Sequence, residues 1–328
     1  MRRFRQFWRR RRAALGLAVA TTAIVIAAPA VSGAADAADA ESHRTQARFD
    51  ANKKKVRPGA KVKVRGQFAA RPQPQQSSSA LNAAPAPSPE APQSVRIEFK
   101  PAGKDNYRFA DRTKADKEGR YTHTVKVRRS GYFRAVAPDG RVSEPERVRV
   151  KSRVRAKLAN NDVNLGDKLK VKGSVAPAIG HRRVVVKVGG DTVATKTNKR
   201  GKFVARWKAD DTGTKKVTVA AKGDEIAAGS KDKAGKATVY RPAEASYYGP
   251  GFYGGRTACG QTLSPGMLGV AHKTMPCGTK VKLRYGNKTV KVPVIDRGPY
   301  AGDREFDLTE ATKNKLGFPS TGTVWTNK

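Results

Sequence analysis

The last quarter of the chain contains two segments that decide its fold, Val294-Ile295-Asp296-Arg297-Gly298-Pro299-Tyr300 and Phe306-Asp307-Leu308-Thr309. Asp296 follows a run of alternating valines and precedes an Arg-Gly-Pro turn, so its carboxylate should lie where a strand meets a loop. Asp307 comes eleven residues later, after another short extended piece. Two carboxylates at strand ends that face one groove have the chemistry needed for acid and base work on a glycosidic bond.

These segments and their neighbours resemble a known family. In chain order the matching motifs are Ala245-Ser246-Tyr247-Tyr248-Gly249, Gly254-Gly255-Arg256-Thr257-Ala258-Cys259-Gly260, Ala271-His272-Lys273-Thr274-Met275-Pro276-Cys277-Gly278-Thr279, Val294-Ile295-Asp296-Arg297-Gly298-Pro299 and Phe306-Asp307-Leu308-Thr309. Together they resemble the double-psi β-barrel of rare-lipoprotein-A-type proteins, which are related to expansins and to barwin-like endoglucanases. The match covers about 80 of the 328 residues. It implies a six-stranded double-psi β-barrel at residues 245–328.

The resemblance implies activity on cell-wall polysaccharide. The family includes lytic transglycosylases, which cut the glycan strands of peptidoglycan, and the related expansins loosen walls without hydrolysis. We expect peptidoglycan as the partner and cleavage of the MurNAc-GlcNAc bond as the reaction. The alternative is a non-catalytic, expansin-like protein that binds polysaccharide and loosens the wall.

One departure from the family pattern bears on the mechanism. Many members have Ser-Gly-Glu followed by an Asp three residues later, where this chain has Cys259-Gly260-Gln261 and then Ser264. A hydrolase needs an acid and a second carboxylate. A lytic transglycosylase needs only one carboxylate, because the C6 hydroxyl of the sugar itself attacks the anomeric carbon.

Three residues are candidates for catalysis. Asp307 is the expected general acid, because its motif resembles the one that carries the essential aspartate of expansins and the catalytic acid of related endoglucanases; the alternative is a cap for a helix at 310–316. Asp296 would assist it, or would only fix the turn through Arg297 or backbone amides. His272 matches a histidine common in the family and would bind substrate or relay a proton, or would be structural.

We expect the substrate to be bound by hydroxyl, aromatic and cationic side chains near these residues. The aromatic residues of this region, Phe252 among them, suit a sugar-stacking groove wall, and core filling is the alternative. The candidate substrate-binding residues are Ser246, Tyr247, Tyr248, Tyr253, Arg297 and Tyr300.

Charge is distributed unevenly along the chain. The 328 residues include 67 Lys and Arg against 27 Asp and Glu, a formal net charge of +40. Only +7 of this falls at residues 245–328, and +33 lies upstream. Such an excess indicates a polyanionic partner, which is nucleic acid, an anionic wall polymer or a membrane.

The N-terminus indicates which of these partners is available. Residues 1–34 combine an arginine-rich start, an apolar run at 13–28 and small residues suited to cleavage, which predicts a secretory signal peptide; an uncleaved anchor is the alternative. We therefore expect a bacterial protein that is secreted or associated with the cell wall, and that touches the membrane only through the signal segment before cleavage.

Outside the cytoplasm, two cysteines are expected to form a pair. Cys259 and Cys277 would close a loop of the barrel and stabilise it by about 3 kcal/mol. A thiol nucleophile or a metal site is the alternative. The four histidines are scattered without the spacing of a ligand set, so we expect no metal and no cofactor.

The region between the signal and the barrel contains a long internal repeat. After a leader at 35–48 that we expect to be disordered, the segment at 56–66 lines up with the segment at 163–173, and both belong to short alternating strands separated by turn residues. This predicts two tandem immunoglobulin-like β-sandwich modules, at 49–152 and 153–241, and an all-β protein. The first module has a flexible Pro/Ala/Ser/Gln insert at 69–94, and residues 241–244 would be a hinge into the barrel.

The polar strand positions of both modules are mainly Lys and Arg. They are Lys61, Lys63, Arg65, Lys168, Lys170 and Lys172. Either they form an ordinary solvated sheet face, or they hold the protein to anionic cell-wall polymers by a salt-dependent attraction. No exposed aromatics interleave with these cations, so nucleic acid is not expected as a partner. We expect the protein to be a monomer.

Overall fold

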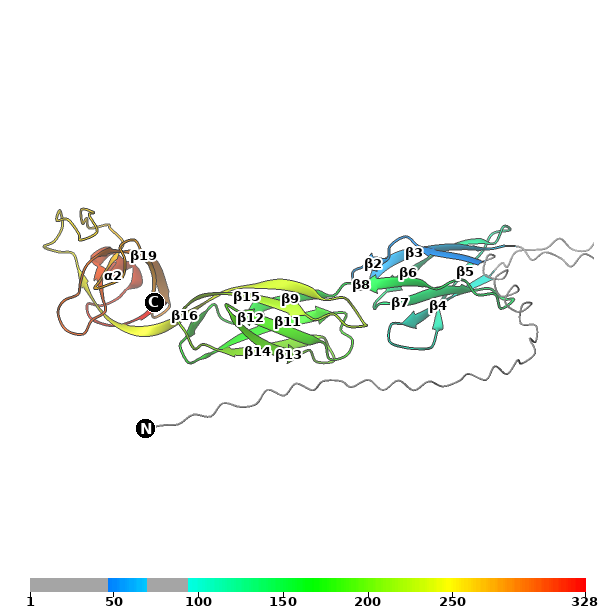
Figure 1. Ribbon diagram of the computed structural model, residues 1–328. Coiled ribbons are helices and arrows are strands. Elements are labelled where there is room, and N and C mark those ends of the chain that lie inside the picture. Colours follow the sequence, from blue (N-terminus) through cyan, green and yellow to red (C-terminus); the bar gives the residue numbers. More distant parts are fainter. Residues whose placement is uncertain (1–46, 70–93) are drawn as a thin grey trace, which may run out of the picture. The chain divides into compact units, whose positions relative to one another are not determined.

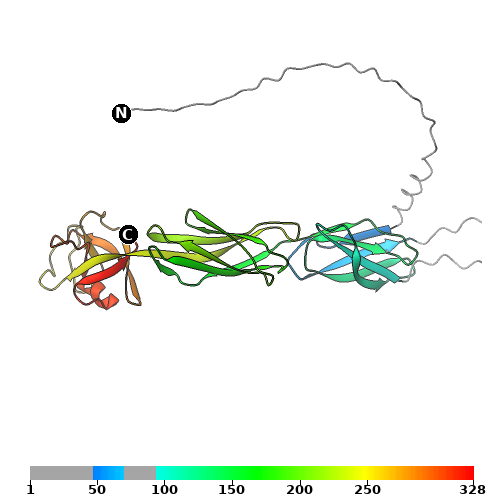
Figure 2. The same cartoon turned by 90° about the horizontal axis from the view of Figure 1, so that it is seen from below.

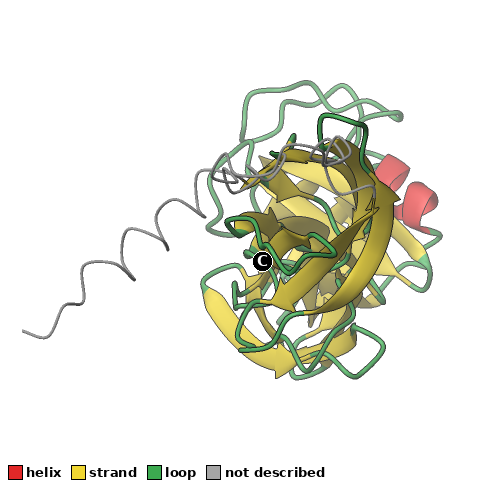
Figure 3. Ribbon diagram, turned by 90° about the vertical axis from the view of Figure 1, so that its right-hand side faces the viewer, coloured by secondary structure: helices red, strands yellow, loops and turns green. Residues whose placement is uncertain are grey.

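The computed structural model describes residues 47–69 and 94–328. Strands dominate these residues, which also contain the short helix α2 (Glu310–Leu316), drawn in red in Figure 3. The prediction of an all-β protein is confirmed. The predicted signal peptide, most of the leader and most of the insert lie outside the described residues. Within the described ranges, no helix is long and apolar enough to cross a membrane.

The first module consists of two sheets that face one shared core. Their strand orders are β1-β3-β6 and β2-β8-β7-β4-β5. Alternation along β3 buries Val62 and Val64 and exposes Lys61 and Lys63, as period-two patterning requires. The strands are β1 (Ala47–Ala51), β2 (Lys55–Val56), β3 (Ala60–Phe68), β4 (Ser94–Pro101), β5 (Arg108–Lys114), β6 (Arg120–Val127), β7 (Gly131–Val136) and β8 (Glu146–Val150). Strand β1 begins two residues before the predicted module, because Ala47 is buried opposite Phe68.

The second module repeats this arrangement. Its sheets have the orders β14-β11-β9 and β13-β12-β15-β16, and β10 pairs with β16. A second core cluster, which includes Leu169, Val186 and Trp207, fills the space between them. The strands are β9 (Arg153–Leu158), β10 (Asp162–Asn164), β11 (Lys168–Ala176), β12 (Arg183–Val188), β13 (Asp191–Lys196), β14 (Lys202–Lys208), β15 (Gly213–Ala221) and β16 (Ser230–Tyr248).

The internal repeat corresponds to equivalent structure in the two modules. Strands β3 and β11 follow matching turns, and each contains a glycine against which an aromatic ring of the neighbouring strand packs. A Cβ on Gly66 would lie 2.2 Å from the Tyr121 hydroxyl, and one on Gly173 would lie 2.5 Å from the Phe203 ring. Only glycine fits either position. The immunoglobulin-like assignment and the exact module boundaries stay predictions.

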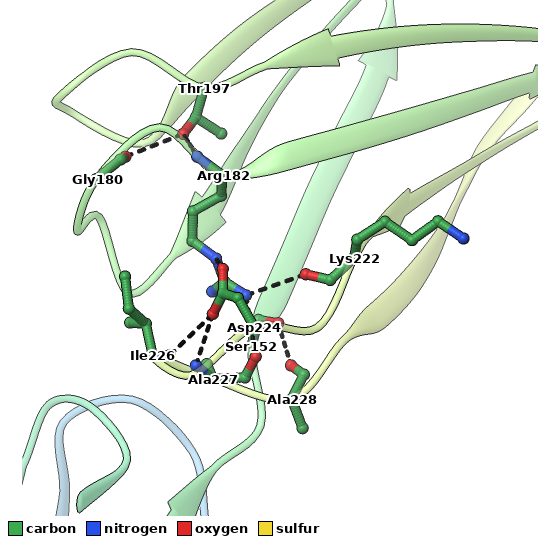
Figure 4. Close-up of polar contacts among 9 residues, drawn as sticks. All are labelled: Ser152, Gly180, Arg182, Thr197, Lys222, Asp224, Ile226, Ala227 and Ala228. Atoms are coloured by element: carbon green, nitrogen blue, oxygen red, sulfur yellow. Dashed lines mark hydrogen bonds and ion pairs between the residues drawn. The ribbon is translucent and has the colours of Figure 1, made fainter. Parts of the chain in front are cut away.

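A buried arginine fixes the loop between β15 and β16 (Figure 4). The Arg182 side chain donates to the Asp224 carboxylate at 2.7 Å and to the carbonyls of Lys222 and Ala227 at 3.2 and 3.1 Å. Asp224 in turn accepts the amides of Ile226 and Ala227 at 3.0 Å. The loop so held places Ala227 in the core cluster of the first module.

Strand β16 is continuous from the second module into the barrel (Figure 1). Its first part pairs with β15, and from Arg241 to Ala245 it pairs with β21 (Gly322–Thr326), seen in red beside the yellow β16 in Figure 2. The prediction of a hinge at 241–244 is therefore wrong. Pro242 lies within the strand opposite Trp325, and a proline is tolerated there because β16 pairs at this residue with β21 on one side only.

The C-terminal region is a closed six-stranded barrel. Its strands pair in the order β16-β20-β17-β19-β18-β21, and β21 returns to β16. The pairs β16/β20 and β17/β19 are parallel, and the other pairs are antiparallel. The remaining strands are β17 (Val270–His272), β18 (Lys280–Tyr285), β19 (Lys288–Asp296) and β20 (Phe306–Thr309). Core residues such as Val292, Phe306 and Leu308 fill the interior.

Candidate active site on the outer face of the barrel

Strand alternation turns the polar side chains of β16 and β20 away from the barrel core. Phe306 and Leu308 are fully buried inside, so Asp307 between them faces outward. Ala245 is likewise buried, which turns Ser246 outward, and the parallel register places Ser246 directly opposite Asp307. The Ser246 hydroxyl donates to the Asp307 carboxylate at 2.8 Å.

A β-bulge brings Asp296 to the same face. Val270 pairs with Val294, but the next residue, Ala271, pairs with Asp296, so Ile295 is the extra residue. Without this bulge, Asp296 would share the inward face of Val294, because residues two apart on a strand point the same way. The bulged Ile295 packs over Gly269, where a Cβ would lie 2.4 Å from Ile295 Cδ1.

Both aspartates therefore flank one small residue. Ala271 pairs with Asp296 on one side and with Asp307 on the other. Two strand spacings place the aspartate Cα atoms about 10 Å apart. The small side chain of Ala271 leaves the space between the two carboxylates open.

A loop after β16 covers this face and makes a cavity of about 250 Å³, here called the aspartate cavity. It is lined by Tyr248, Phe252, Gly255, Arg256, Thr257, Leu263, Ala271, Asp296, Arg297, Gly298, Pro299, Tyr300 and Asp307. Phe252 and Tyr300 are 65% and 80% exposed at its mouth. Exposed rings beside carboxylates are the usual surroundings of a bound sugar, because a pyranose face packs well on an aromatic ring.

The two carboxylates have different surroundings. Asp296 Oδ1 accepts the backbone amides of Ala258 and Arg297, both at 2.8 Å. Two donors to one oxygen hold this side chain in place. The predicted alternative for Asp296, a carboxylate that fixes its turn through backbone amides, describes these contacts.

Asp307 is partly buried at the wall of the cavity. Burial raises the pKa of its carboxyl above the ordinary value, and the negative charge of Asp296 adds to the rise. The hydrogen bond from Ser246 and the positive charge of Arg304 oppose it. A carboxyl with these properties keeps its proton to higher pH, as a general acid must. The alternative role as a helix cap is wrong, because Thr309 caps α2 by accepting the Thr312 amide.

Tyr248 stands between these groups and stays neutral. Burial raises the pKa of its hydroxyl, and the charges of Asp296 and Asp307 raise it further. A neutral phenol can donate to a carboxylate or to a sugar oxygen within the aspartate cavity.

The disulfide holds the covering loop to the barrel. Cys259 and Cys277 are bonded, with their Cα atoms 5.7 Å apart, which confirms the predicted pairing. The Cys259 amide also donates to the Ile295 carbonyl at 3.3 Å. Ala258, the residue before Cys259, donates its amide to Asp296. The disulfide therefore stabilises the loop that holds one of the two carboxylates.

His272 lies apart from the aspartate cavity. It follows Ala271 on β17, so its ring points to the opposite face and packs on Phe306 with centroids 5.2 Å apart. Its Nδ1 accepts the amides of Thr274 and Met275 at 3.1 and 3.0 Å, and its Nε2 lies 3.8 Å from the Glu305 carboxylate. Burial lowers the pKa of the imidazole. A direct role in catalysis has no support from this position.

Two of the predicted substrate-binding tyrosines also point elsewhere. Tyr247 packs against the barrel core, with the Lys313 ammonium 4.5 Å from its ring centroid. The Tyr253 hydroxyl donates to Glu310 on α2. Neither lines the aspartate cavity, whereas Tyr248, Arg297 and Tyr300 do, and Ser246 reaches it through Asp307.

The covering loop contributes residues that the motifs alone did not single out for binding. Arg256 and Thr257 line the cavity, and the Thr257 hydroxyl bonds the Gln261 side chain at 3.2 Å. Gln261 thus braces the loop and is not itself a lining residue. Arg256 and Thr257 belong to one of the motifs that match the family. The motif does not distinguish residues that line the cavity from residues that only support the loop. Among the described residues, no group of acidic, histidine or cysteine side chains could hold a metal ion.

Comparison with known proteins places this site in a family of domains. The family model described as lytic transglycolase matches residues 234–326. The probable endolytic peptidoglycan transglycosylase RlpA of Synechocystis sp. is 46% identical over 81 residues, which are 24% of this chain and 25% of that protein. The endolytic peptidoglycan transglycosylases RlpA of Campylobacter jejuni and Pseudomonas aeruginosa are 40% and 43% identical over 82 residues, 24% of this chain and 30% and 24% of theirs.

The C-terminal domain is therefore a double-psi β-barrel. Within that class it is an RlpA-like domain, as the motifs predicted. The chain spans about a quarter of the length of the relatives it matches, and each match covers 24% of this chain.

Proposed function

We propose that the barrel is a peptidoglycan lytic transglycosylase that cleaves the MurNAc-GlcNAc bond within glycan strands. The observation that carries the proposal is Asp307, a half-buried carboxyl of raised pKa on the wall of a cavity that is also lined by the exposed rings of Phe252 and Tyr300. The names of the RlpA relatives support the same reaction. A protein with this substrate acts outside the cytoplasmic membrane, in agreement with the predicted signal peptide.

In this mechanism Asp307 acts twice. Its proton passes to the glycosidic oxygen, which leaves as the C4 hydroxyl of GlcNAc as the bond to the MurNAc anomeric carbon breaks. The C6 hydroxyl of the same MurNAc attacks that carbon, and its proton returns to the Asp307 carboxylate. The product is a 1,6-anhydro sugar, no water is consumed, and Asp307 ends protonated as it began.

The remaining residues of the site orient the Asp307 carboxyl and stabilise the charge that develops on the substrate. Asp296 is held by two amides on the far side of Ala271, where its charge would stabilise the positive charge that develops at the anomeric carbon. Ser246 orients the Asp307 carboxyl. His272 would act only indirectly, by holding the β17 turn through the amides of Thr274 and Met275.

The test compares full-length protein with two variants on peptidoglycan sacculi. Asp307→Asn should abolish the release of 1,6-anhydromuramic products detected by mass spectrometry. Asp303→Asn, which removes an exposed carboxylate four residues away, should leave the release unchanged. If wild type and Asp307→Asn both release nothing while still binding sacculi, the enzyme proposal fails and the expansin-like alternative replaces it.

The expansin-like alternative has one specific observation in its favour. Gln261 and Ser264 stand where many family members have acidic residues, so the aspartate cavity has only Asp296 and Asp307 as carboxylates among its lining residues. A groove of this kind would bind a glycan on Phe252 and Tyr300 without cutting it.

A further inference from the structure

The exposed face of the sheet β14-β11-β9 in the second module is covered with cations. Nine Lys and Arg side chains alternate with buried residues along the three strands, and all nine are exposed. We call this surface the cationic face. Its residues are Arg153, Arg155, Lys157, Lys168, Lys170, Lys172, Lys202, Arg206 and Lys208.

These cations share one side of the sheet because of the strand register. Lys168 is opposite Lys208, Lys170 is opposite Arg206, and Lys172 is opposite Lys157. Residues directly opposite in an antiparallel pair have Cβ atoms about 5 Å apart, and like charges there destabilise the sheet. Three such pairs on one small sheet are an arrangement that folding by itself does not favour.

No ion pair relieves this repulsion within the described part of the chain, although Asp232 of β16 accepts the backbone amide of Ala156 on β9 at 2.8 Å. The three strands contain no Asp or Glu, and none of the nine side chains makes an ion pair there. Lysines on edge strands can serve to prevent sheet-to-sheet aggregation. That explanation does not apply to Lys168, Lys170 and Lys172, because they lie on β11, which is the central strand of the sheet.

The equivalent sheet of the first module shows that the fold does not require this charge. On the same face of β1-β3-β6, Thr124 lies opposite Lys63, whereas in the second module Arg206 lies opposite Lys170. Arg65 is paired with Asp50 at 3.5 Å, and Arg120 is paired with Asp116 at 2.9 Å. The two faces therefore differ in degree: the first module also has a like-charge pair, Lys61 and Lys126, but two of its arginines are paired with aspartates.

The chemistry of the surface selects its partner. Lys and Arg on adjacent strands form rows about 4.8 Å apart, with about 7 Å between successive side chains along a strand, which suits an extended chain with regularly repeated phosphates. The aromatic residues of β14, Phe203 and Trp207, are buried beneath the sheet, so bases would find no ring to stack on. We propose that the cationic face binds a linear phosphodiester polymer of the cell wall; its placement in the wall rests on the proposed function.

The test measures binding of labelled poly(glycerol phosphate) to the full-length protein over a series of salt concentrations. Lys168→Gln/Lys170→Gln/Lys172→Gln should weaken binding at least tenfold at low salt. It should also reduce the slope of log affinity against log salt by about 2, the value for three lost phosphate contacts on a flexible chain. The matched control, Lys61→Gln/Lys63→Gln/Lys126→Gln, removes three exposed cations from the first module and should change affinity less than about threefold.

Further variants and probes keep the outcome decisive. Lys168→Arg/Lys170→Arg/Lys172→Arg should bind like wild type, and single Gln variants should each weaken binding two- to threefold, so a folding defect in the triple variant would be recognised. Equal losses in both triple variants would overturn the proposal, because net charge alone would explain the binding. Tighter binding to single-stranded DNA or to phosphatidylglycerol vesicles would overturn it in favour of those partners.

Failure of this proposal is distinguishable from failure of the proposed function. Release of anhydro products is measured on peptidoglycan stripped of phosphodiester polymers, and depends on Asp307. Binding of the polymer is measured without peptidoglycan, and depends on β11.

Discussion

The aspartate cavity and the cationic face are both sheet surfaces turned away from a hydrophobic core, and they hold their charges in opposite ways. In the cavity two carboxylates are partly buried, and each has named hydrogen-bond donors. On the cationic face nine charges stand in solvent without ion pairs in the described residues. A partly buried charge has a large electrostatic interaction energy with its neighbours. An exposed charge has a small one that is screened by salt, and the contributions of several exposed charges add. We expect single substitutions to have large effects in the cavity, and small effects on the cationic face that become large only in combination.

The largest expected effect contrasts one charge from each surface. Asp307→Asn should lower peptidoglycan cleavage by about 100- to 10,000-fold, the usual contribution of a general acid. Lys170→Gln should leave cleavage of polymer-free peptidoglycan unchanged. Both are measured as release of anhydro products per unit time. If Asp307→Asn lowered cleavage by less than tenfold, a single charge in the cavity would not have the large effect that distinguishes it from a charge on the cationic face.

The same variant should not weaken the fold. Because folding raises the pKa of Asp307, its ionisation at neutral pH opposes folding, and the neutral Asn removes that penalty. The free energy of unfolding in urea at pH 7 should stay equal or increase. A marked decrease would mean that the Ser246 contact outweighs burial.

Removing the disulfide should have the next largest effect. Cys259→Ser/Cys277→Ser opens a link of sequence separation 18, which should destabilise the barrel by about 3 kcal/mol in urea unfolding. Cleavage should fall too, because Ala258 would no longer be held at Asp296. Wild-type protein treated with a reductant provides the control, and binding to the cationic face should be unaffected in both.

A smaller effect is expected from filling the space beneath the bulge. Gly269→Ala should cost about 1–3 kcal/mol and lower cleavage, because its Cβ would displace Ile295 and with it the outward turn of Asp296. Gly266→Ala is the matched control, since nothing lies within 4 Å of its Cβ. Equal stability and activity in both variants would show that the bulge does not depend on Gly269.

The smallest expected effect is a shift in the pH dependence. The rate should fall as pH rises through the raised pKa of Asp307, because the general acid must be protonated. Ser246→Ala removes a hydrogen bond that lowers this pKa, so the descending limb of kcat/KM should move to higher pH. Movement to lower pH would contradict the assignment of that limb to Asp307.

The sequence predicted much of the fold and part of the site. Motif order predicted the barrel, compartment and cysteine count predicted the disulfide, and the repeat indicated two related modules. The prediction of a hinge at 241–244 was wrong because these residues pair with β21, a strand far away in the sequence, and so remain extended. His272 was grouped with the aspartates because it belongs to a matching motif, although its neighbour Ala271 takes the outward position.

The features of the two sites that can be read from the sequence are local ones. The alternation of polar and apolar residues predicts which side chains of β11 and β20 face away from the core, because successive residues on a strand point to opposite faces. It therefore determined the cations of the cationic face and the outward turn of Asp307. The sequence does not show that Ser246, Asp307, Ala271 and Asp296 lie on adjacent strands. Their proximity depends on the parallel pairings of β16 with β20 and of β17 with β19, and on the bulge at Ile295, which reverses the alternation of β19. Pairing and register are set by the closure of the whole barrel, which no short segment encodes.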